Sequence, residues 1–363
     1  MNSSEFAPDN VDRMLLQVVE ETFAAQPWRR DAPLVVVNDV TGALSAWART
    51  QRMPVRFLQD SAAAARAHAE LTGPVATAPS REVFTNAATV LYRLARPLEA
   101  LEELAWHVAR WASEDVVLLA GQLQRHLNFS MNGVLEQSFE EVSASRGYYK
   151  SRALRARRPK PLHGDTPPRI PRKNVVQVVG ADLHLRAYGL TFGAARLDPG
   201  TKLLLETLIA DADFPAAATV VDLGCGNGTV AAVLAHRFAP AQVIATDDSA
   251  SAVESTRQTL RANGVADVEV MHQSGLVDMP DCSVDAVVLN PPFHRGTEIT
   301  SDVAFHLFDE AARVLKPGGV LWAVSNVSRQ YRPHLTHRVG PTWQLARDQR
   351  FIVTQSRKDE AYE

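Results

Sequence analysis

The chain has 363 residues, 46% of them hydrophobic, which is enough for two domains that each bury a core of ordinary size. The polar, acidic first ten residues lack the basic and apolar regions of a secretory signal, and no stretch approaches the roughly 18 apolar residues of a membrane span. The formal net charge of −3 excludes a uniformly basic protein, and the only cysteines, Cys225 and Cys282, lack metal-ligand spacing, so we expect a cytoplasmic protein without disulfides or bound metal.

Short apolar runs alternate with amphipathic stretches in the N-terminal half. This pattern predicts strands at 34–37, 55–58, 89–94 and 116–120 and helices at 42–49, 61–71 and 98–111. Such an alternation implies right-handed crossovers and a parallel sheet covered on both faces. The first strand is followed by Asn38-Asp39-Val40-Thr41-Gly42, which has one glycine where a cofactor loop needs several. This half therefore has the fold pattern without the binding loop.

A basic segment, residues 146–173, follows this half. It contains ten Lys or Arg residues and one acid, Asp165, so it carries +9 and the remaining chain carries −12. A basic strip on an acidic body indicates a patch for a polyanion, while its five prolines predict an extended connector. The two interpretations are compatible, because a connector can also contact phosphate. The candidate phosphate contacts are Arg152, Arg155, Arg157, Arg158 and Lys160.

The C-terminal half repeats the alternation more clearly. It predicts helices at 201–212, 229–238, 250–262 and 302–315 and strands at 218–223, 242–247, 268–272, 284–289 and 320–325. Residues 316–319, Lys-Pro-Gly-Gly, predict a turn before the last of these strands, and 342–347 with 350–355 predict an antiparallel edge pair. We expect two related α/β units in tandem, a first domain at 1–158, a basic, proline-rich linker at 159–174 and a second domain at 175–363.

A glycine-rich loop, Asp222-Leu223-Gly224-Cys225-Gly226-Asn227-Gly228, follows the strand at 218–223. Its three glycines let the backbone approach a ligand closely at the carboxyl edge of the sheet, where open α/β folds bind cofactors. An acid at the start of the loop would repel a pyrophosphate, whereas it suits the sulfonium and ammonium groups of S-adenosylmethionine. Asp247 ends the next strand, where it can accept both ribose hydroxyls. The loop therefore predicts S-adenosylmethionine as cofactor, bound by Asp222, Gly224, Gly226, Gly228 and Asp247.

A second motif, Asn290-Pro291-Pro292-Phe293, follows the strand at 284–289 of the same predicted sheet. The exocyclic amine of a nucleobase is a poor nucleophile, because its lone pair is delocalised into the ring. The side-chain oxygen of Asn290 and a proline carbonyl can orient the two N–H bonds, the prolines fix the backbone, and Phe293 supplies a stacking surface. The motif thus predicts methyl transfer to a planar amine. His294 is the next residue, and we interpret it as having no part in the reaction.

With these motifs, the chain from Val220 to Lys358 resembles the class I S-adenosylmethionine-dependent methyltransferases. Within them it resembles the two-domain bacterial ribosomal RNA guanine-N2 methyltransferases, which share the sequence Asn-Pro-Pro-Phe-His and the segment Phe192 with Leu197-Asp198-x-Gly200-Thr201. The resemblance implies two tandem Rossmann-like methyltransferase domains: an N-terminal one that is degenerate and recognises RNA, and a C-terminal, catalytic one built on a seven-stranded sheet with an antiparallel edge.

The resemblance also implies cofactor contacts that include Ser274 near the adenine, and target-base contacts at Asn290, Pro291 and Phe293. The implied substrate is a guanine in ribosomal RNA or in a ribosomal subunit, and we expect a monomer. Two alternatives remain open. One is a methyltransferase acting on adenine N6 or on a glutamine of a translation factor, and the other is a non-catalytic RNA-binding or assembly protein with a methyltransferase fold.

Overall fold

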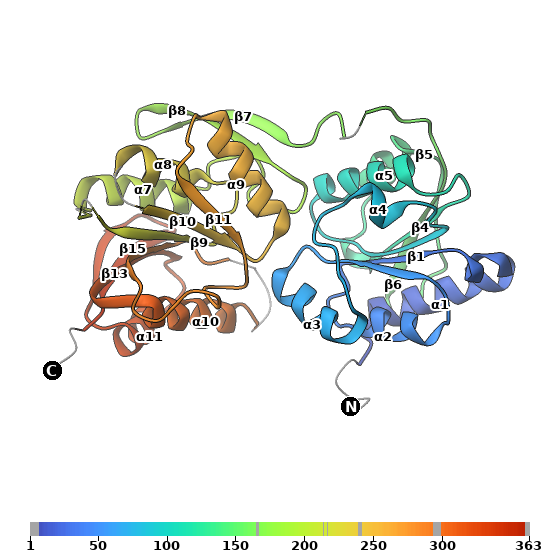
Figure 1. Ribbon diagram of the computed structural model, residues 1–363, viewed down its shortest axis with the longest axis horizontal. Helices are drawn as coiled ribbons and strands as arrows, with labels where there is room; N and C mark the ends of the chain where they lie inside the picture. The colour runs from blue at the N-terminus through green and yellow to red at the C-terminus, as the bar shows by residue number, and fades with distance from the viewer. Residues whose placement is uncertain are drawn as a thin grey trace. The chain divides into compact units, whose positions relative to one another are not determined.

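The computed structural model describes residues 7–164, 167–212, 214–215, 217–238, 242–292 and 299–359. Backbone contacts divide the chain into two compact units, which are described separately (Figure 1). Unit 1 comprises Met1–Pro171 with Tyr188–Leu190, and unit 2 comprises Arg172–Ala187 with Thr191–Glu363. No helix among the described residues is long and apolar enough to cross a membrane.

Unit 1 contains a six-stranded sheet with the order β2-β1-β3-β4-β6-β5. Its strands are β1 (Leu34–Val37), β2 (Val55–Leu58), β3 (Thr89–Arg93), β4 (Val117–Leu123), β5 (Phe139–Ala144) and β6 (Ser151–Pro159). Strands β1 to β4 pair in parallel, and β6 pairs antiparallel with both β4 and β5. The four parallel strands were predicted, because each is a short apolar run.

Helices cover both faces of this sheet. Its helical segments are α1 (Asn10–Ala25), η1 (Pro27–Asp31), α2 (Ala43–Thr50), α3 (Ala62–Thr72), α4 (Arg81–Phe84), α5 (Leu98–Trp111), η2 (Gln124–His126) and α6 (Phe129–Glu136). Helices α1 and α2 bury apolar side chains on one face, and α4, α5 and α6 do so on the other. Helix α1 was missed by the sequence analysis, although Met14, Leu15, Val18 and Val19 are fully buried at helical spacing.

The basic segment is a strand over much of its length, which corrects its interpretation as an extended connector. Residues 151–159 form β6 inside the sheet of unit 1, and residues 172–178 form β7 of unit 2. A connector is confined to the stretch between these two strands, which contains four of the five prolines. Arginine side chains obscured the strand pattern, because Arg155 and Arg157 occupy partly buried positions of β6.

Unit 2 contains a seven-stranded sheet with the order β11-β10-β9-β12-β13-β15-β14. Its strands are β9 (Thr219–Leu223), β10 (Gln242–Asp247), β11 (Val268–His272), β12 (Val284–Leu289), β13 (Leu315–Asn326), β14 (Thr342–Arg347) and β15 (Phe351–Arg357). The helices of this unit are α7 (Pro199–Asp211), α8 (Thr229–Arg237), α9 (Ala250–Ala262), α10 (Ile299–Val314) and α11 (Arg332–Arg338). The first five strands are parallel, and β15 pairs antiparallel with β13 and β14.

Three local features of unit 2 differ from the predictions, one of which is the unpredicted helix α11. A hairpin of β7 (Arg172–Val178) and β8 (Ala181–Ala187) was not predicted, and β8 packs on α9. Residues 316–319 do not separate a helix from a strand, because β13 already begins at Leu315. They form an irregularity inside β13, where the register with β12 shifts and Gly318 takes a φ of 76°.

The two sheets have the same topology apart from one strand. Strands β2-β1-β3-β4-β6-β5 correspond in order and direction to β10-β9-β12-β13-β15-β14, and β11 has no counterpart among the described residues of unit 1. Helix α1 packs on β4 and β6 just as α7 packs on β13 and β15. The predicted fold class, two tandem α/β units with a reduced N-terminal one and a seven-stranded C-terminal one, is therefore confirmed.

Candidate active site

The predicted cofactor and target-base residues meet at one edge of the unit 2 sheet. Strands β9, β10 and β12 are parallel neighbours, with β9 in the middle. Parallel strands end at the same edge, so the glycine loop, Asp247 and Asn290 all leave the sheet there. The structure thus brings Asp222 and Asn290, which are 68 positions apart in the sequence, to the same edge of the sheet.

The glycine loop has the backbone geometry that the sequence predicts. Gly224, Gly226 and Gly228 have φ values of 76°, 55° and 80°, in the left-handed region that favours glycine. A Cβ added at Gly224 or Gly226 would meet nothing within 4 Å, so both residues face open space. Gly228 has a different role, because its Cβ would lie 2.9 Å from Thr256 Cα, where the start of α8 approaches α9.

Asp222 is buried beneath this loop. It is 2% exposed, and its Oδ2 accepts a hydrogen bond of 2.9 Å from the backbone N–H of Ala231 in α8. Burial raises the pKa of the Asp222 carboxyl to about 7, and the nearby Asp247 carboxylate adds to the increase. The structure therefore gives Asp222 the function of tying the strand to the following helix, while its contact with a cationic ligand stays a prediction.

Asp247 is half-buried at the end of β10 and is held rigidly. Its Oδ2 accepts from Gly226 N at 3.0 Å, and its Oδ1 accepts from Ser249 N at 2.9 Å. A carboxylate has about four lone-pair sites, so this group can also accept hydroxyl donors. Ser274 lies half-buried after β11, two residues beyond His272, at the same edge. Open space beside two glycines, with a fixed acid next to it, fits the ribose and amino acid parts of S-adenosylmethionine.

The side chain of Asn290 is oriented by helix α7. Its Nδ2 donates to Asp198 Oδ2 at 3.1 Å and to Thr201 Oγ1 at 2.8 Å. Both partners belong to the N-terminus of α7, where Asp198 is the N-cap and also accepts from Thr201 N at 2.9 Å. The Oδ1 atom of Asn290 is buried and has no hydrogen-bond partner among the described residues. The amide is thus fixed with its acceptor unused.

Asp198 and Thr201 were not predicted as site residues. Their only sequence signal was the segment Leu197-Asp198-x-Gly200-Thr201, which the resemblance had already singled out. Asn227 was missed in the same way: its Nδ2 donates to the carbonyl oxygens of Ala194 and Arg196, both at 2.9 Å. These bonds join the glycine loop to the segment before α7.

The other residues of the second motif are described in part. Pro291 is buried and Pro292 is exposed, directly after the end of β12. Phe293 and His294 lie outside the described residues. The predicted contacts of Pro291, Pro292 and Phe293 with a target base therefore stay predictions.

The candidate phosphate contacts do not share one face. Side chains alternate along β6, so Arg152 lies on one face of the strand and Arg155 and Arg157 lie on the other. Arg158 has a φ of 56°, which interrupts this alternation. Arg158 forms ion pairs with Glu140 at 3.0 Å and Glu141 at 3.2 Å. Arg152 is exposed and lines an open cavity with Asn128, Phe129 and Asn132. Lys160 donates to the carbonyl oxygen of Glu136.

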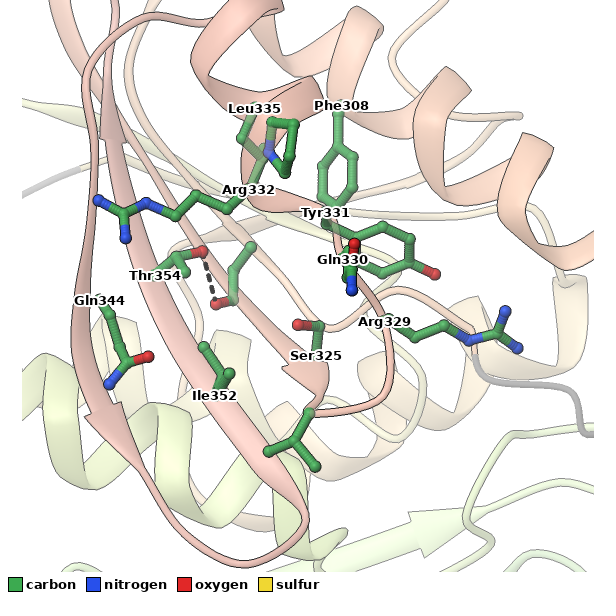
Figure 2. Close-up of a pocket in the computed structure, with 13 residues that line it drawn as sticks. Phe308, Ser325, Arg329, Gln330, Tyr331, Arg332, Leu335, Gln344, Ile352 and Thr354 are labelled. Atoms are coloured by element: carbon green, nitrogen blue, oxygen red, sulfur yellow. Dashed lines mark hydrogen bonds between the residues drawn. The ribbon is translucent and has the colours of Figure 1, made fainter.

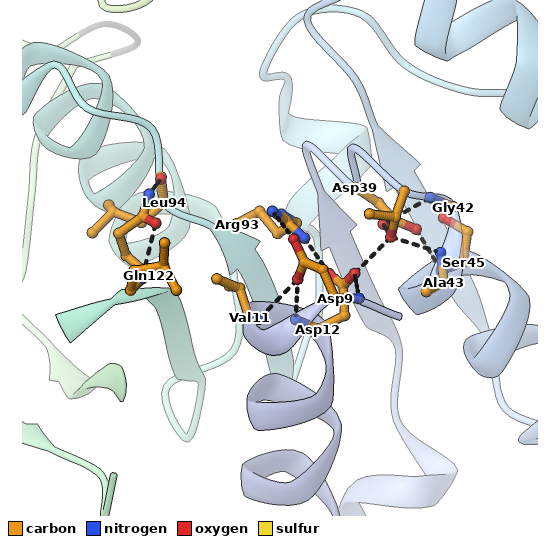
Figure 3. Close-up of polar contacts among 12 residues, drawn as sticks. Asp9, Val11, Asp12, Asp39, Gly42, Ala43, Ser45, Arg93, Leu94 and Gln122 are labelled. Carbon is orange, nitrogen blue, oxygen red and sulfur yellow. Dashed lines mark hydrogen bonds and ion pairs between the residues drawn. The ribbon is translucent and has the colours of Figure 1, made fainter. Parts of the chain in front are cut away.

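Unit 1 has a counterpart of the asparagine position, and it is occupied by an arginine. In unit 2, Leu289 is the last residue of β12 that pairs with the central strand β9. In unit 1, Tyr92 is the last residue of β3 that pairs with the central strand β1. The next residues, Asn290 and Arg93, are therefore equivalent. Figure 3 shows that Arg93 reaches the N-terminus of α1, as Asn290 reaches that of α7.

The arginine is neutralised by two acids. Arg93 forms ion pairs with Asp9 at 2.9 Å and with the fully buried Asp12 at 2.5 Å. Asp9 is the N-cap of α1 and Asp12 is its third residue, the positions that Asp198 and Thr201 hold in α7. In the first loop of unit 1, Asp39 accepts from Gly42 N at 3.1 Å and from Ser45 N at 2.7 Å. Unit 1 therefore keeps the scaffold of the site with its polar groups paired internally.

Two family models match the chain. The RLMG N-terminal domain matches residues 2–160, and the methyltransferase small domain matches residues 183–355. Together the two models cover both units.

Whole-chain relatives agree with these models. A ribosomal RNA large subunit methyltransferase G of Streptomyces coelicolor is 31% identical over 98% of this chain and 97% of its own. One of Shewanella amazonensis is 28% identical over 96% of this chain and 92% of its own. In fold, the chain is similar to a T. thermophilus 16S rRNA N2 methyltransferase solved with AdoMet and guanosine, with a TM-score of 0.81, 23% identity, and coverage of 97% of this chain and 93% of that one. The chain therefore belongs to the family of the ribosomal RNA large subunit methyltransferases G, which confirms the predicted class, an S-adenosylmethionine-dependent ribosomal RNA methyltransferase.

Proposed function

We propose that this protein transfers a methyl group from S-adenosylmethionine to the exocyclic N2 of a guanine in the RNA of the large ribosomal subunit. The observation that carries the proposal is the buried, unpaired Oδ1 of Asn290. Its amide nitrogen is held by Asp198 and Thr201, and we propose that the remaining acceptor takes a hydrogen bond from the substrate amine. The assignment to the large ribosomal subunit comes from the names of the relatives. The choice of guanine is supported by the similar T. thermophilus structure, which was solved with guanosine.

The residues of the chain orient the reacting amine. Asn290 Oδ1 accepts one N–H of the amine and the carbonyl of Pro291 accepts the other, which turns the nitrogen lone pair out of the ring system. Bound S-adenosylmethionine supplies a methyl group on a positively charged sulfur. The proton leaves the amine after transfer, so this chemistry does not require a strong general base. Alignment of the reacting atoms can contribute on the order of 7 to 11 kcal/mol.

A target base within structured RNA must first leave its stack, at a cost of about a few kcal/mol. We propose that unit 1 helps to provide this binding energy, with Arg152, Arg155, Arg157 and Lys160 among its phosphate contacts and Arg158 partly offset by its two glutamates. We also propose two domains joined by the short connector between β6 and β7, a monomer, and action in the cytoplasm, where a ribosomal substrate is found.

The test is a comparison of ribosomal RNA from cells with and without the gene. Digestion and mass mapping should show one N2-methylguanosine that disappears from large-subunit RNA when the gene is deleted and returns with the wild-type gene. Complementation with Asn290→Ala should not restore it. An unchanged N2-methylguanosine profile together with the loss of a methylated adenine would assign the activity to adenine N6. No change in any methylated nucleotide would refute the proposed reaction.

A further inference from the structure

Unit 2 holds a cavity of about 280 Å³ that the proposed reaction does not use. It lies between α10, α11, the end of β13 and the antiparallel strands β14 and β15 (Figure 2). Phe308, Leu335 and Ile352 give it an apolar lining. The ring of Tyr331, also in the lining, packs edge-on against Phe308 with 5.3 Å between centroids. This part of the cavity offers a flat, apolar surface that suits a planar group.

Three polar side chains also line the cavity. Ser325 is 8% exposed, and its hydroxyl has no hydrogen-bond partner among the described residues. Gln330 and Gln344 also line the cavity, and both side chains are exposed at its opening. Each of these groups can donate and accept, which matches the mixed edges of a nucleobase. Figure 2 shows Ser325, Gln330 and Gln344 around the same hollow.

The charge of the lining is positive. Arg329 and Arg332 belong to it, and none of its thirteen residues is an aspartate or glutamate. Arg332 is fixed at the rim, since its Nε donates to the carbonyl oxygen of Thr342 at 3.2 Å. A planar apolar surface, two side-chain amides and two guanidinium groups together match the base and the phosphate of one nucleotide.

The position of the cavity connects it to the candidate active site. In the sheet, Leu289 of β12 pairs with Ala323 of β13, so Asn290 and Ser325 lie near the same edge on adjacent strands. Val288 packs in the core on the face of the sheet that α7 covers, whereas Ala323 packs in the core on the face that α10 covers. Because Asn290 bonds to α7, the cavity and the asparagine lie on opposite faces of one sheet edge.

We propose that this cavity binds one nucleotide of the RNA substrate close to the target guanine, with the base inside the cavity and the phosphate at Arg329 and Arg332. The inference rests on the proposed function, since it assumes an RNA strand at this edge. Holding a neighbouring nucleotide on the far face of the sheet would keep the target base out of its stack. It would also let the enzyme distinguish the sequence around the guanine.

The test uses the full-length protein and protein-free large-subunit ribosomal RNA. The double variant Gln330→Ala/Gln344→Ala removes two base contacts and should raise the dissociation constant for RNA roughly tenfold. Gln349→Ala, a matched change in the exposed turn of the same hairpin, should leave it unchanged. Arg332→Gln should reduce the slope of log K against log salt by about one, and Arg347→Gln, an exposed arginine of β14 outside the cavity, should reduce it less.

Affinity for S-adenosylmethionine and the melting temperature should stay at wild-type values in all four variants, which separates a lost RNA contact from a folding defect. Wild-type RNA binding by folded cavity variants would overturn the inference and leave the proposed function standing. Wild-type protein that binds the RNA but makes no N2-methylguanosine would refute the proposed function, and the variants would still decide about the cavity. Failure of the wild-type protein to bind the RNA would refute both.

Discussion

At the scale of single residues, the two polar atoms of the Asn290 side chain behave differently. The Nδ2 atom forms two hydrogen bonds within the protein, and the buried Oδ1 atom forms none with the described residues. The sequence motif alone identified the residue type and its place after a strand. It did not reveal that Asp198 and Thr201 orient it, because these two residues precede it by about 90 positions and meet it only in the folded sheet.

The different uses of the two amide atoms predict the kinetics of two variants. Asn290→Ala should keep affinity for S-adenosylmethionine within a few-fold and should lose most of kcat, because its hydrogen bond acts on the amine and not on the cofactor. Thr201→Val removes one of the two bonds that orient the amide, so kcat should fall by about twofold to tenfold, and Thr201→Ser should restore it. Calorimetry and steady-state kinetics measure both effects. A parallel loss of cofactor affinity in Asn290→Ala would overturn the assigned role.

The raised pKa of Asp222 predicts that the stability of the protein depends on pH. Burial raises the pKa of its carboxyl to about 7 in the folded protein, from 3.8 for an ordinary aspartate. The folded protein therefore binds the proton more tightly than the unfolded chain does. The contribution of this group to the free energy of unfolding is fully present below pH 3.8 and is lost as the pH rises to about 7, by about 1.4 kcal/mol per pH unit. In urea unfolding, Asp222→Asn should gain stability relative to wild type between pH 5 and pH 8. An equal difference at both values would contradict the raised pKa.

At the scale of elements, the buried parallel strands were the most predictable parts of the fold. Each reads as a run of apolar residues, since helices cover both faces of the sheet. Helix α1, strands β5 and β6 and the β7–β8 hairpin were missed. Strand β6 carries arginines at partly buried positions, and β7 is mostly exposed, so neither shows a clear apolar pattern.

The glycine loop gives the prediction at this scale. Gly228→Ala places a Cβ 2.9 Å from Thr256 Cα at a φ of 80° and should lower the free energy of unfolding by about 2 to 4 kcal/mol. Gly264→Ala is the matched control, because Gly264 has a φ of 69° with nothing within 4 Å, and it should cost about 1 kcal/mol. Urea denaturation of both variants separates steric contact from backbone strain. Equal losses would show that the approach of α8 to α9 is not tight.

At the scale of the whole molecule, two sheets of common topology have different chemistry. Unit 1 retains the helix-to-strand connection of the site but fills the asparagine position with Arg93, whose charge is neutralised by Asp9 and Asp12. Its one-glycine loop is closed by Asp39. The absence of a cofactor loop could be predicted from the sequence. The equivalence of Arg93 with Asn290 could not, because it depends on the strand register.

The charge distribution predicts a difference between two arginines of β6. Arg152 is exposed and forms no ion pair within the described part of the chain, whereas Arg158 is paired with Glu140 and Glu141. Arg152→Gln should therefore weaken binding to large-subunit RNA several-fold and lower its salt dependence, while Arg158→Gln should have a smaller effect. Filter binding over a range of salt concentrations measures both. Equal effects would show that the glutamates do not offset Arg158 in the complex.

The sequence by itself determined the class of fold, the cofactor loop and the amine-binding motif, because these depend on local patterns: apolar runs, glycine spacing and a short tetrapeptide. Only the tertiary structure decided how the site is completed. It joined Asn290 to the N-terminus of α7, divided the basic segment between two faces of β6, and placed a largely apolar cavity on the other face of the same sheet edge. Each of these results follows from strand order and register, which bring distant residues together and which no local pattern records.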